Sequence, residues 1–169
     1  MKKILMGVIM LLTCGCVKVP QGVEPVTGFE LSRYLGTWYE IARLDHSFER
    51  GLDQVSAEYS MREDGGVRVL NRGFGKDGWK TAEGRAYFVG DSKTGYLKVS
   101  FFGPFFGSYV IFDLDADYQT AYVCGPNRDY LWLLSRTPKV PQATLDRFIK
   151  KSSELGFETD GLIFPDQTK

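Results

Sequence analysis

The fold of this chain is decided by the stretch Gly36-Thr37-Trp38-Tyr39-Glu40-Ile41-Ala42-Arg43. Directly before it, Leu31-Ser32-Arg33-Tyr34-Leu35 has apolar residues three and four apart, which favours one or two helical turns that end at a glycine. The stretch itself is typical of a first β-strand. A large aromatic residue at the start of a strand, just after a helical turn, can plug one end of a closed barrel.

Two further stretches later in the chain support this interpretation, because of their order and their spacing from the first. Leu114-Asp115-Ala116-Asp117-Tyr118 is predicted at a turn, and Leu134-Ser135-Arg136-Thr137-Pro138 is predicted at the end of a late strand. In this order and spacing, the three stretches resemble the signature regions of the lipocalin family. The first stretch resembles the family's bacterial, apolipoprotein-D-like branch, and the resemblance covers most of residues 29–165.

The resemblance implies an eight-stranded barrel that is closed at one end. Carried over to this sequence, the tryptophan at the closed end is Trp38, and the arginine of the last strand that lies over it is Arg136. The structural signature positions implied in this way are Gly36, Trp38, Asp115, Asp117, Tyr118 and Arg136.

Length and composition limit the function classes. A chain of 169 residues with 43% hydrophobic residues can bury one core, so we expect a single folded domain. Lys plus Arg equals Asp plus Glu at 21 each, so no basic field indicates a nucleic acid as a partner. An aromatic content of 14%, together with 19 glycines, favours an all-β protein with many turns.

The N-terminus is typical of a bacterial lipoprotein. Lys2-Lys3 precedes a short apolar run over residues 4–12, and Thr13-Cys14-Gly15-Cys16 then resembles a lipoprotein box, although Thr13 stands where the pattern usually has leucine. We therefore predict a signal peptide over 1–15, a lipidated Cys16 with a tether over 16–28, and a lipocalin domain over 29–169. An ordinary secretory signal with chance cysteines is the alternative. Val17 after Cys16 resembles the pattern sorted to the outer membrane.

The remaining cysteine cannot form a disulfide within the domain. After removal of residues 1–15, only Cys124 is left besides the anchor cysteine. A nucleophilic role would need a base, and the sequence brings none near it. We therefore expect Cys124 to be a small buried apolar residue.

Alternating apolar residues and turn signals predict eight antiparallel strands in a meander. The expected strands are 37–44, 54–61, 67–73, 80–89, 96–102, 108–114, 120–125 and 130–135. In the late strands, the residues that point to either face of the sheet are apolar, so both faces should be covered. A helix over 141–156 with one apolar face can cover the outside. The predicted fold class is an all-β, up-and-down barrel with one C-terminal helix packed outside.

The barrel interior and its open end carry the predicted ligand site. Inward positions such as Ala57, Gly84 and Ala86 are small and leave room, whereas plain core packing is the alternative for each position. The turns alternate between the two ends, so loops 45–52, 75–79, 103–107 and 126–129 should form the mouth. Exposed rings there imply contact with ligand, membrane or another subunit, so a homodimer stays open. The predicted cavity and mouth residues are Tyr59, Phe88, Val99, Phe101, Phe105, Phe106, Tyr109 and Ile111.

Enzymatic chemistry is not indicated. His46 is the only histidine, no cysteine and histidine cluster has metal-ligand spacing, and no nucleophile elbow or phosphate loop is present, so neither a metal nor a cofactor is predicted. Glu40 shares the parity of Trp38 and would be a buried carboxylate, unless a bulge turns it to solvent.

The predicted function is that of a lipid-anchored lipocalin in the bacterial outer membrane, facing the periplasm. It would bind and store or transport a hydrophobic ligand, a fatty acid or lysophospholipid. The alternatives are a structural or stress-related envelope lipoprotein with a filled barrel, and a lipid-modifying enzyme.

Overall fold

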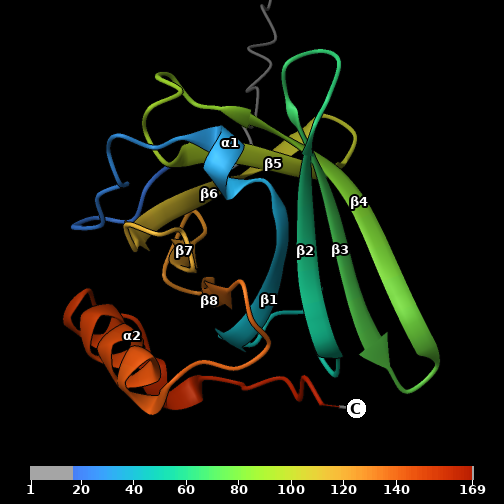
Figure 1. The fold of residues 1–169 in the computed structure, drawn as a ribbon, viewed down its shortest axis with the longest axis vertical. Coiled ribbons are helices and arrows are strands. Elements are labelled where there is room, and N and C mark those ends of the chain that lie inside the picture. Colours follow the sequence, from blue (N-terminus) through green and yellow to red (C-terminus); the bar gives the residue numbers. More distant parts are fainter. Residues whose placement is uncertain (1–16, 169) are drawn as a thin grey trace, which may run out of the picture.

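The computed structural model describes residues 17–168, and these form a closed antiparallel barrel. Each strand pairs with the next along the chain, and β8 pairs with β1 to complete the barrel (Figure 1). The fold class predicted from the sequence is therefore confirmed. The strands are β1 (Gly36–Arg43), β2 (Asp53–Met61), β3 (Val67–Gly75), β4 (Gly78–Phe88), β5 (Tyr96–Phe102), β6 (Phe105–Leu114), β7 (Thr120–Cys124) and β8 (Leu131–Ser135).

Two strands begin two or more residues earlier than the sequence predicts. β4 begins at Gly78 and β6 begins at Phe105, because only two residues separate each of them from the preceding strand. Such two-residue hairpin loops require backbone conformations with positive φ. Gly78, with φ of 102°, and Gly103, with φ of 42°, supply them.

Within the described part of the chain, three helical elements accompany the barrel. They are α1 (Leu31–Tyr34), α2 (Gln142–Glu154) and η1 (Thr159–Gly161). Pro141 directly precedes α2, and Gly156 follows it with φ of 85°, a left-handed conformation that suits the end of a helix. α2 lies against the outside of the barrel beside β7 and β8, as predicted (Figure 1).

Buried apolar side chains form two clusters, one inside the barrel and one beneath α2. Phe148 of α2 is fully buried and packs edge to face on Tyr122 of β7, with ring centroids 5.0 Å apart. The outer cluster explains why the late strands are apolar at both parities, since each parity faces one of the two clusters. Its main members are Ala42, Val110, Phe112, Tyr122, Cys124, Leu131, Leu133, Phe148 and Phe157.

Residues 17–28 lie against the barrel rather than apart from it. The Lys18 amide donates a hydrogen bond to the Ser108 hydroxyl (2.7 Å), and that hydroxyl donates to the Lys18 carbonyl (2.6 Å). Val23 is buried in the outer cluster, and the Val26 amide donates to the Ile111 carbonyl (2.9 Å). We call residues 17–28 the N-terminal strap. The segment expected as a tether is thus hydrogen-bonded to the domain near both of its ends.

The C-terminal segment, residues 162–168, bridges β1 and β2. The register between these strands ends at Tyr39 and Ser56, and beyond that point Ile163 exchanges backbone hydrogen bonds with Arg43 (2.8 and 2.9 Å). The Gln167 side chain then donates to the carbonyls of Glu40 (2.7 Å) and Val55 (2.9 Å). The chain end therefore completes the barrel wall where two neighbouring strands separate.

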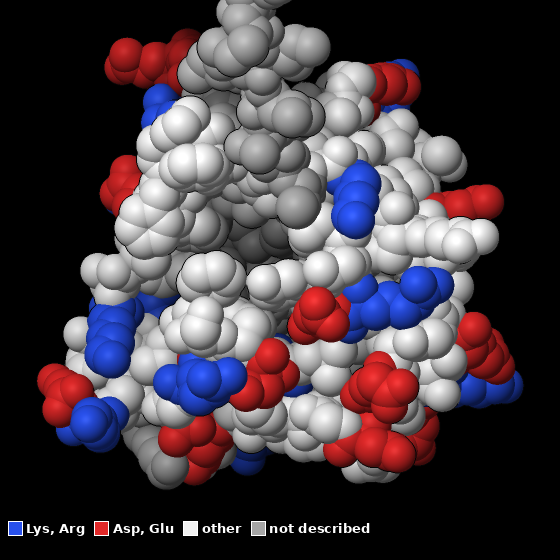
Figure 2. All heavy atoms as spheres, turned by 180° about the vertical axis from the view of Figure 1, so that it is seen from behind, with Lys and Arg blue, Asp and Glu red and all other residues white. Residues whose placement is uncertain are grey.

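The connections assign the two ends of the barrel. α1 and the loops over 62–66, 89–95 and 115–119 lie at one end, which we call the closed end. The loops over 44–52, 76–77, 103–104 and 125–130 lie at the other, which we call the mouth. Seen from behind, the molecule is hollowed near the centre of the view, and the described side chains directly below the hollow are mainly uncharged (Figure 2). No helix within residues 17–168 is long and apolar enough to cross a membrane.

Candidate functional site

The closed end is sealed by a tryptophan and an arginine. Trp38 is fully buried, and its indole N–H donates a hydrogen bond to the Tyr34 carbonyl of α1 (2.8 Å). The guanidinium of Arg136 lies 4.0 Å from the centre of the Trp38 ring system. It donates hydrogen bonds to the carbonyls of Arg33 (2.7 Å) and Thr37 (2.9 Å). One planar cation therefore joins α1, β1 and β8, in the arrangement that the family resemblance implied.

The other signature residues shape the turns at this end. Gly36 has φ of 93°, and a side chain there would meet Arg136. The carboxylate of Asp115 accepts the amide protons of Asp117 (3.2 Å) and Gln119 (2.8 Å), which fixes the turn between β6 and β7. Tyr118, with φ of 57°, accepts the Glu30 amide proton on its hydroxyl (3.0 Å). These residues hold the closed end together.

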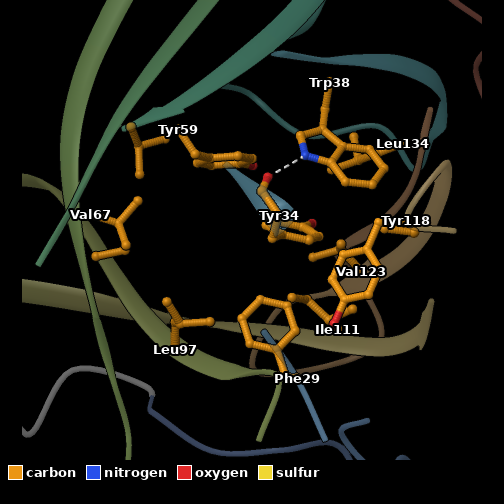
Figure 3. Close-up of a cluster of buried hydrophobic side chains, with 13 residues drawn as sticks. Phe29, Tyr34, Trp38, Tyr59, Val67, Leu97, Ile111, Tyr118, Val123 and Leu134 are labelled. Atoms are coloured by element: carbon orange, nitrogen blue, oxygen red, sulfur yellow. Dashed lines mark hydrogen bonds between the residues drawn. The ribbon is translucent and has the colours of Figure 1, made fainter. Parts of the chain in front are cut away.

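A cavity lies inside the barrel between this plug and the mouth. Its volume, counted as the space open to the centre of a water molecule, is about 120 Å³. The predicted residues Tyr59, Val99, Phe101 and Tyr109 line it, and the small inward residues Ala57 and Ala86 do as well. Figure 3 shows Tyr59, Val67, Leu97, Phe29 and Tyr34 around an open space. The wall is therefore mainly apolar, which suits a hydrophobic ligand.

Two predicted cavity residues lie in the packed part of the barrel instead. Phe88 and Ile111 belong to the inner apolar cluster, but neither contributes to the cavity lining. The reason is Phe29, a residue before α1 that turns into the closed end of the barrel. Its ring packs edge to face on Phe88 at 6.0 Å and lies beside Ile111 (Figure 3). Phe29 itself lines the cavity in their place.

The two predicted mouth phenylalanines lie outside the cavity. Phe105 is largely exposed at the hairpin between β5 and β6. Phe106 is half-buried on the outer surface, where its ring meets Tyr87 at 6.2 Å and the ammonium of Lys98 at 5.0 Å. Both stay predicted contacts for a ligand on its way into the barrel.

Three tyrosine hydroxyls form a polar group within the apolar wall. The Tyr109 hydroxyl shares hydrogen bonds with the hydroxyls of Tyr34 (2.8 Å) and Tyr59 (2.8 Å). All three rings line the cavity. Burial raises the pKa of each phenol, so the three hydroxyls are neutral at physiological pH. They can exchange hydrogen bonds with a neutral polar atom of a ligand.

Two carboxyl groups form a second polar group in the cavity wall, toward the mouth. Glu40 is buried, and the guanidinium of Arg43 donates a hydrogen bond to its carboxyl oxygen (2.7 Å). A β-bulge between Glu40 and Ala42 shifts the register against β8, yet Glu40 keeps the inward direction of Trp38. Glu49, from the loop between β1 and β2, lies 2.8 Å from His46 and accepts the Trp132 indole proton (3.1 Å). Of the two alternatives for Glu40, the structure shows the buried carboxylate.

The two carboxyls differ in protonation. Burial, together with the nearby charge of Glu49, raises the pKa of Glu40 well above its ordinary value. Burial acts to raise the pKa of Glu49, but the interactions with His46 and the hydrogen bonds from Trp132 and Glu40 together lower it below its ordinary value. Glu40 is therefore the group that tends to keep its proton, and Glu49 is the anion of the pair.

The comparisons with known proteins agree with this geometry. Residues 29–167 match the protein family described as Lipocalin-like domain. The chain belongs to the lipocalin family. It is 59% identical to the protein named Outer membrane lipoprotein Blc of Vibrio cholerae, over 96% of this chain and 99% of that one. It is 48% identical to the protein of the same name from Escherichia coli K12, over 94% and 90%.

More distant proteins are also similar to this chain. Rat Apolipoprotein D is 34% identical over 75% of this chain and 72% of its own length. The structure of insecticyanin from the tobacco hornworm superposes with a TM-score of 0.71 at 22% identity, covering 88% of this chain and 86% of that one. The bacterial, apolipoprotein-D-like assignment made from the first signature stretch is therefore confirmed.

This lipocalin belongs to a family of ligand-binding carrier proteins, not enzymes. Within residues 17–168, no group of three or more His, Cys, Asp or Glu side chains could hold a metal ion. Burial raises the pKa of the Cys124 thiol to about 12, so Cys124 is an apolar packing residue and not a nucleophile.

Sequence reasoning missed several residues that line the cavity of the lipocalin. Phe29 and Tyr34 precede the first strand, so no strand parity pointed to them. Glu49 is in a loop that folds into the mouth, and only a carboxylate three residues after the single histidine hinted at the His46 contact. Trp132 also lines the cavity, but it lies on a late strand with apolar residues on both faces, where the sequence does not show which residues point inward.

Proposed function

We propose that this lipocalin is a lipid-anchored carrier that takes a single acyl chain, from a fatty acid or a lysophospholipid, into its barrel. The observation that carries the proposal is the cavity, which is lined mainly by apolar side chains, with neutral tyrosine hydroxyls toward the closed end and the carboxyls of Glu40 and Glu49 toward the mouth. A chain of about ten buried methylenes gains about 8 kcal/mol before the costs of association. Micromolar binding needs no strong polar contact in addition.

The charges in the cavity wall favour one orientation of the ligand. Glu49 is the anionic carboxyl of the pair toward the mouth, and it repels a buried carboxylate or phosphate. Arg50 and Lys80, which stand in or next to mouth loops, are exposed to water. The acyl chain therefore enters first, and an anionic head group stays at the mouth.

The proposed location follows from the relatives and from the N-terminal sequence. Two of the similar bacterial proteins are named as outer membrane lipoproteins. The predicted signal peptide and the predicted lipidation site, Cys16, lie outside the described residues. We propose attachment through Cys16 to the outer membrane, with the barrel in the periplasm.

Labelling with a radioactive fatty acid tests the anchor. The change Cys16→Ser should abolish incorporation, because the lipid would be carried by that thiol. The matched change Cys14→Ser should leave incorporation intact. Labelling that persists in the Cys16→Ser protein contradicts the assignment.

Lipid extraction tests the carrier function. The chain purified from its host should release a fatty acid or lysophospholipid detectable by mass spectrometry. Val69, which is buried in the cavity wall, offers a blocking variant, since Val69→Trp fills the space near Tyr59. Its neighbour Arg68 faces solvent, so Arg68→Trp is the matched control.

The expected result is lipid in the native chain and in the Arg68→Trp variant, with little in the Val69→Trp variant. Overpacking costs about 1–3 kcal/mol, so a urea titration must show that the blocked protein is folded. The absence of lipid from all three proteins favours a structural envelope lipoprotein. A homodimer stays a prediction, and sedimentation of the same samples tests it.

A further inference from the structure

The large exposed apolar side chains of this molecule gather at one end. Within residues 17–168, five of the seven lie in mouth loops or at the strand ends beside them, Phe164 follows Ile163, which pairs with Arg43 at the mouth end of β1, and only Met61 lies at the closed end. Scattered apolar residues on a surface need no explanation, but a concentration around one opening indicates a contact. The six are Phe48, Phe74, Trp79, Phe102, Phe105 and Phe164.

The most exposed rings are at the tips of mouth loops. Phe102 and Phe105 are partners across the hairpin between β5 and β6, and they are 75% and 66% exposed. Phe48, in the loop between β1 and β2, is 70% exposed. Because these loops project from the end of the barrel, the rings can enter an apolar medium without any strand moving.

Cations accompany the rings at this end. The guanidinium of Arg72 lies 5.3 Å from the Trp79 ring, and Arg85 lies 5.7 Å from the Phe106 ring. Aromatic rings beside Arg and Lys are the combination found where proteins meet the head-group region of a bilayer. A purely apolar patch would fit a protein partner equally well, whereas this mixture favours a phospholipid surface.

The N-terminal strap fixes where the chain leaves the barrel. Lys18 is held on Ser108, which stands three residues after Phe105 on β6. The Gln21 carbonyl also accepts a hydrogen bond from Arg128, in the mouth loop between β7 and β8. Consecutive Cα atoms are about 3.8 Å apart, so an anchor on Cys16 is attached two residues before a point fixed on β6. A flexible tether would allow any orientation, but a short attachment beside the mouth does not.

We propose that the mouth docks onto the bilayer that holds the lipid anchor, with Phe48, Phe102 and Phe105 inserted among the head groups. The inference rests on the proposed lipidation of Cys16. The strap is then an orienting element that directs the cavity entrance toward the membrane. A single-chain lipid can pass between bilayer and barrel along this contact without crossing water.

Tryptophan quenching by brominated phosphatidylcholine tests the orientation. The lipidated full chain is reconstituted into vesicles in a Trp79→Phe background, and a reporter is added as Phe105→Trp at the mouth or as Met61→Trp at the closed end. Met61 is a suitable control position, because it is 53% exposed. The mouth reporter should lose at least half of its fluorescence, and the closed-end reporter should lose almost none. Equal quenching of the two reporters, or quenching of the Met61 reporter alone, overturns the inference.

The background protein separates this inference from the carrier function. It retains Trp38 and Trp132, and Trp132 lines the cavity, so quenching of the Trp79→Phe protein by a brominated fatty acid, added without vesicles, reports an acyl chain inside the barrel. Interior quenching without mouth quenching leaves the carrier function standing and overturns the docking. Mouth quenching without interior quenching supports the docking and overturns the carrier function. Protein that does not float with the vesicles shows that the anchor itself is absent.

A charge substitution provides the second arm. In the otherwise unchanged chain, Phe102→Asp combined with Phe105→Asp should reduce the quenching of Trp79 by at least half, whereas Met61→Asp should leave it unchanged. Unchanged quenching in the double variant contradicts the docking. If the rings are instead shielded in detergent without lipid and the chain sediments as a dimer, then a second copy covers the mouth and the inference is wrong.

Discussion

The two ends of the barrel use aromatic residues in opposite ways. At the closed end, Trp38 is fully buried and donates its indole N–H proton to the Tyr34 carbonyl. The Arg136 guanidinium lies over the face of its ring. At the mouth, Trp79 and Phe105 are more than half exposed. The difference teaches that the stabilising contacts are concentrated at the plugged end, whereas the open end keeps surface available for binding. Substitutions at the two ends should therefore separate stability from lipid contact.

Removing the buried tryptophan is the largest expected effect. Trp38→Ala should lower the free energy of unfolding by about 3–5 kcal/mol, because the deletion leaves a cavity and an indole-sized gap beneath Arg136. The matched change Trp79→Ala at the mouth should cost less than about 1 kcal/mol, since its ring is already half in water. Urea titration of both variants measures the difference. Similar losses in the free energy of unfolding for the two variants would contradict the distinction between the ends.

Arg136→Lys should have the next largest effect. A lysine cannot stack as a planar fork over Trp38 and bond two carbonyls at once, so we expect a loss of about 1–3 kcal/mol of stability. Binding of a fatty acid should change less than twofold. The conservative change Arg50→Lys at the mouth is the control, because the Arg50 pair with Asp45 is exposed. An unchanged unfolding midpoint with loss of ligand binding would make Arg136 a site residue.

The carboxyl pair predicts a smaller, pH-dependent effect. An unfolded glutamate ionises near 4.5, whereas folded Glu40 keeps its proton to a higher pH because it is buried. Between these two pKa values the folded state binds more protons, so the Glu40 contribution to stability falls as pH rises. The free energy of unfolding contributed by Glu40 falls by at most about 1.4 kcal/mol per pH unit.

Glu40→Gln should abolish this fall, because a neutral amide replaces the protonated acid. The stability of the variant relative to the native chain should therefore increase from about pH 4.5 upward. The lowered pKa of Glu49 acts in the opposite direction, but Glu49 is present in both proteins. Urea midpoints measured across this pH range give the comparison. A difference that is flat with pH shows that Glu40 ionises normally in the folded chain.

Periodicity and family resemblance predicted most of the architecture. The alternation over 54–61 gave the parity of β2, and the two-sided apolar pattern of β6 and β8 required the helix that became α2. The contact between Arg136 and Trp38 could not come from periodicity, because 98 positions separate the two residues. It came from the resemblance, and the structure places the ring and the guanidinium in contact.

What the sequence did not predict lies outside the regular strands. The N-terminal strap is rich in proline and glycine, which is typical of a linker, yet its hydrogen bonds go to Ser108 and Ile111 on a distant strand. Phe29 enters the barrel from this same region and displaces Phe88 and Ile111 from the cavity lining. Local patterns contain no signal for such contacts, since they depend on how the chain returns to the sheet.

The central claim is that the barrel binds an acyl chain through its open end, and a chain-length series tests it most directly. Fatty acids of increasing length are titrated against the fluorescence of Trp132, which lines the cavity, in the Trp79→Phe background. The affinity should rise several-fold with each added methylene, at about 0.8 kcal/mol each, and then level off when the cavity is full. A head-group change from carboxylate to alcohol should matter less than two methylenes. An affinity that does not depend on chain length would contradict the account and favour a filled barrel.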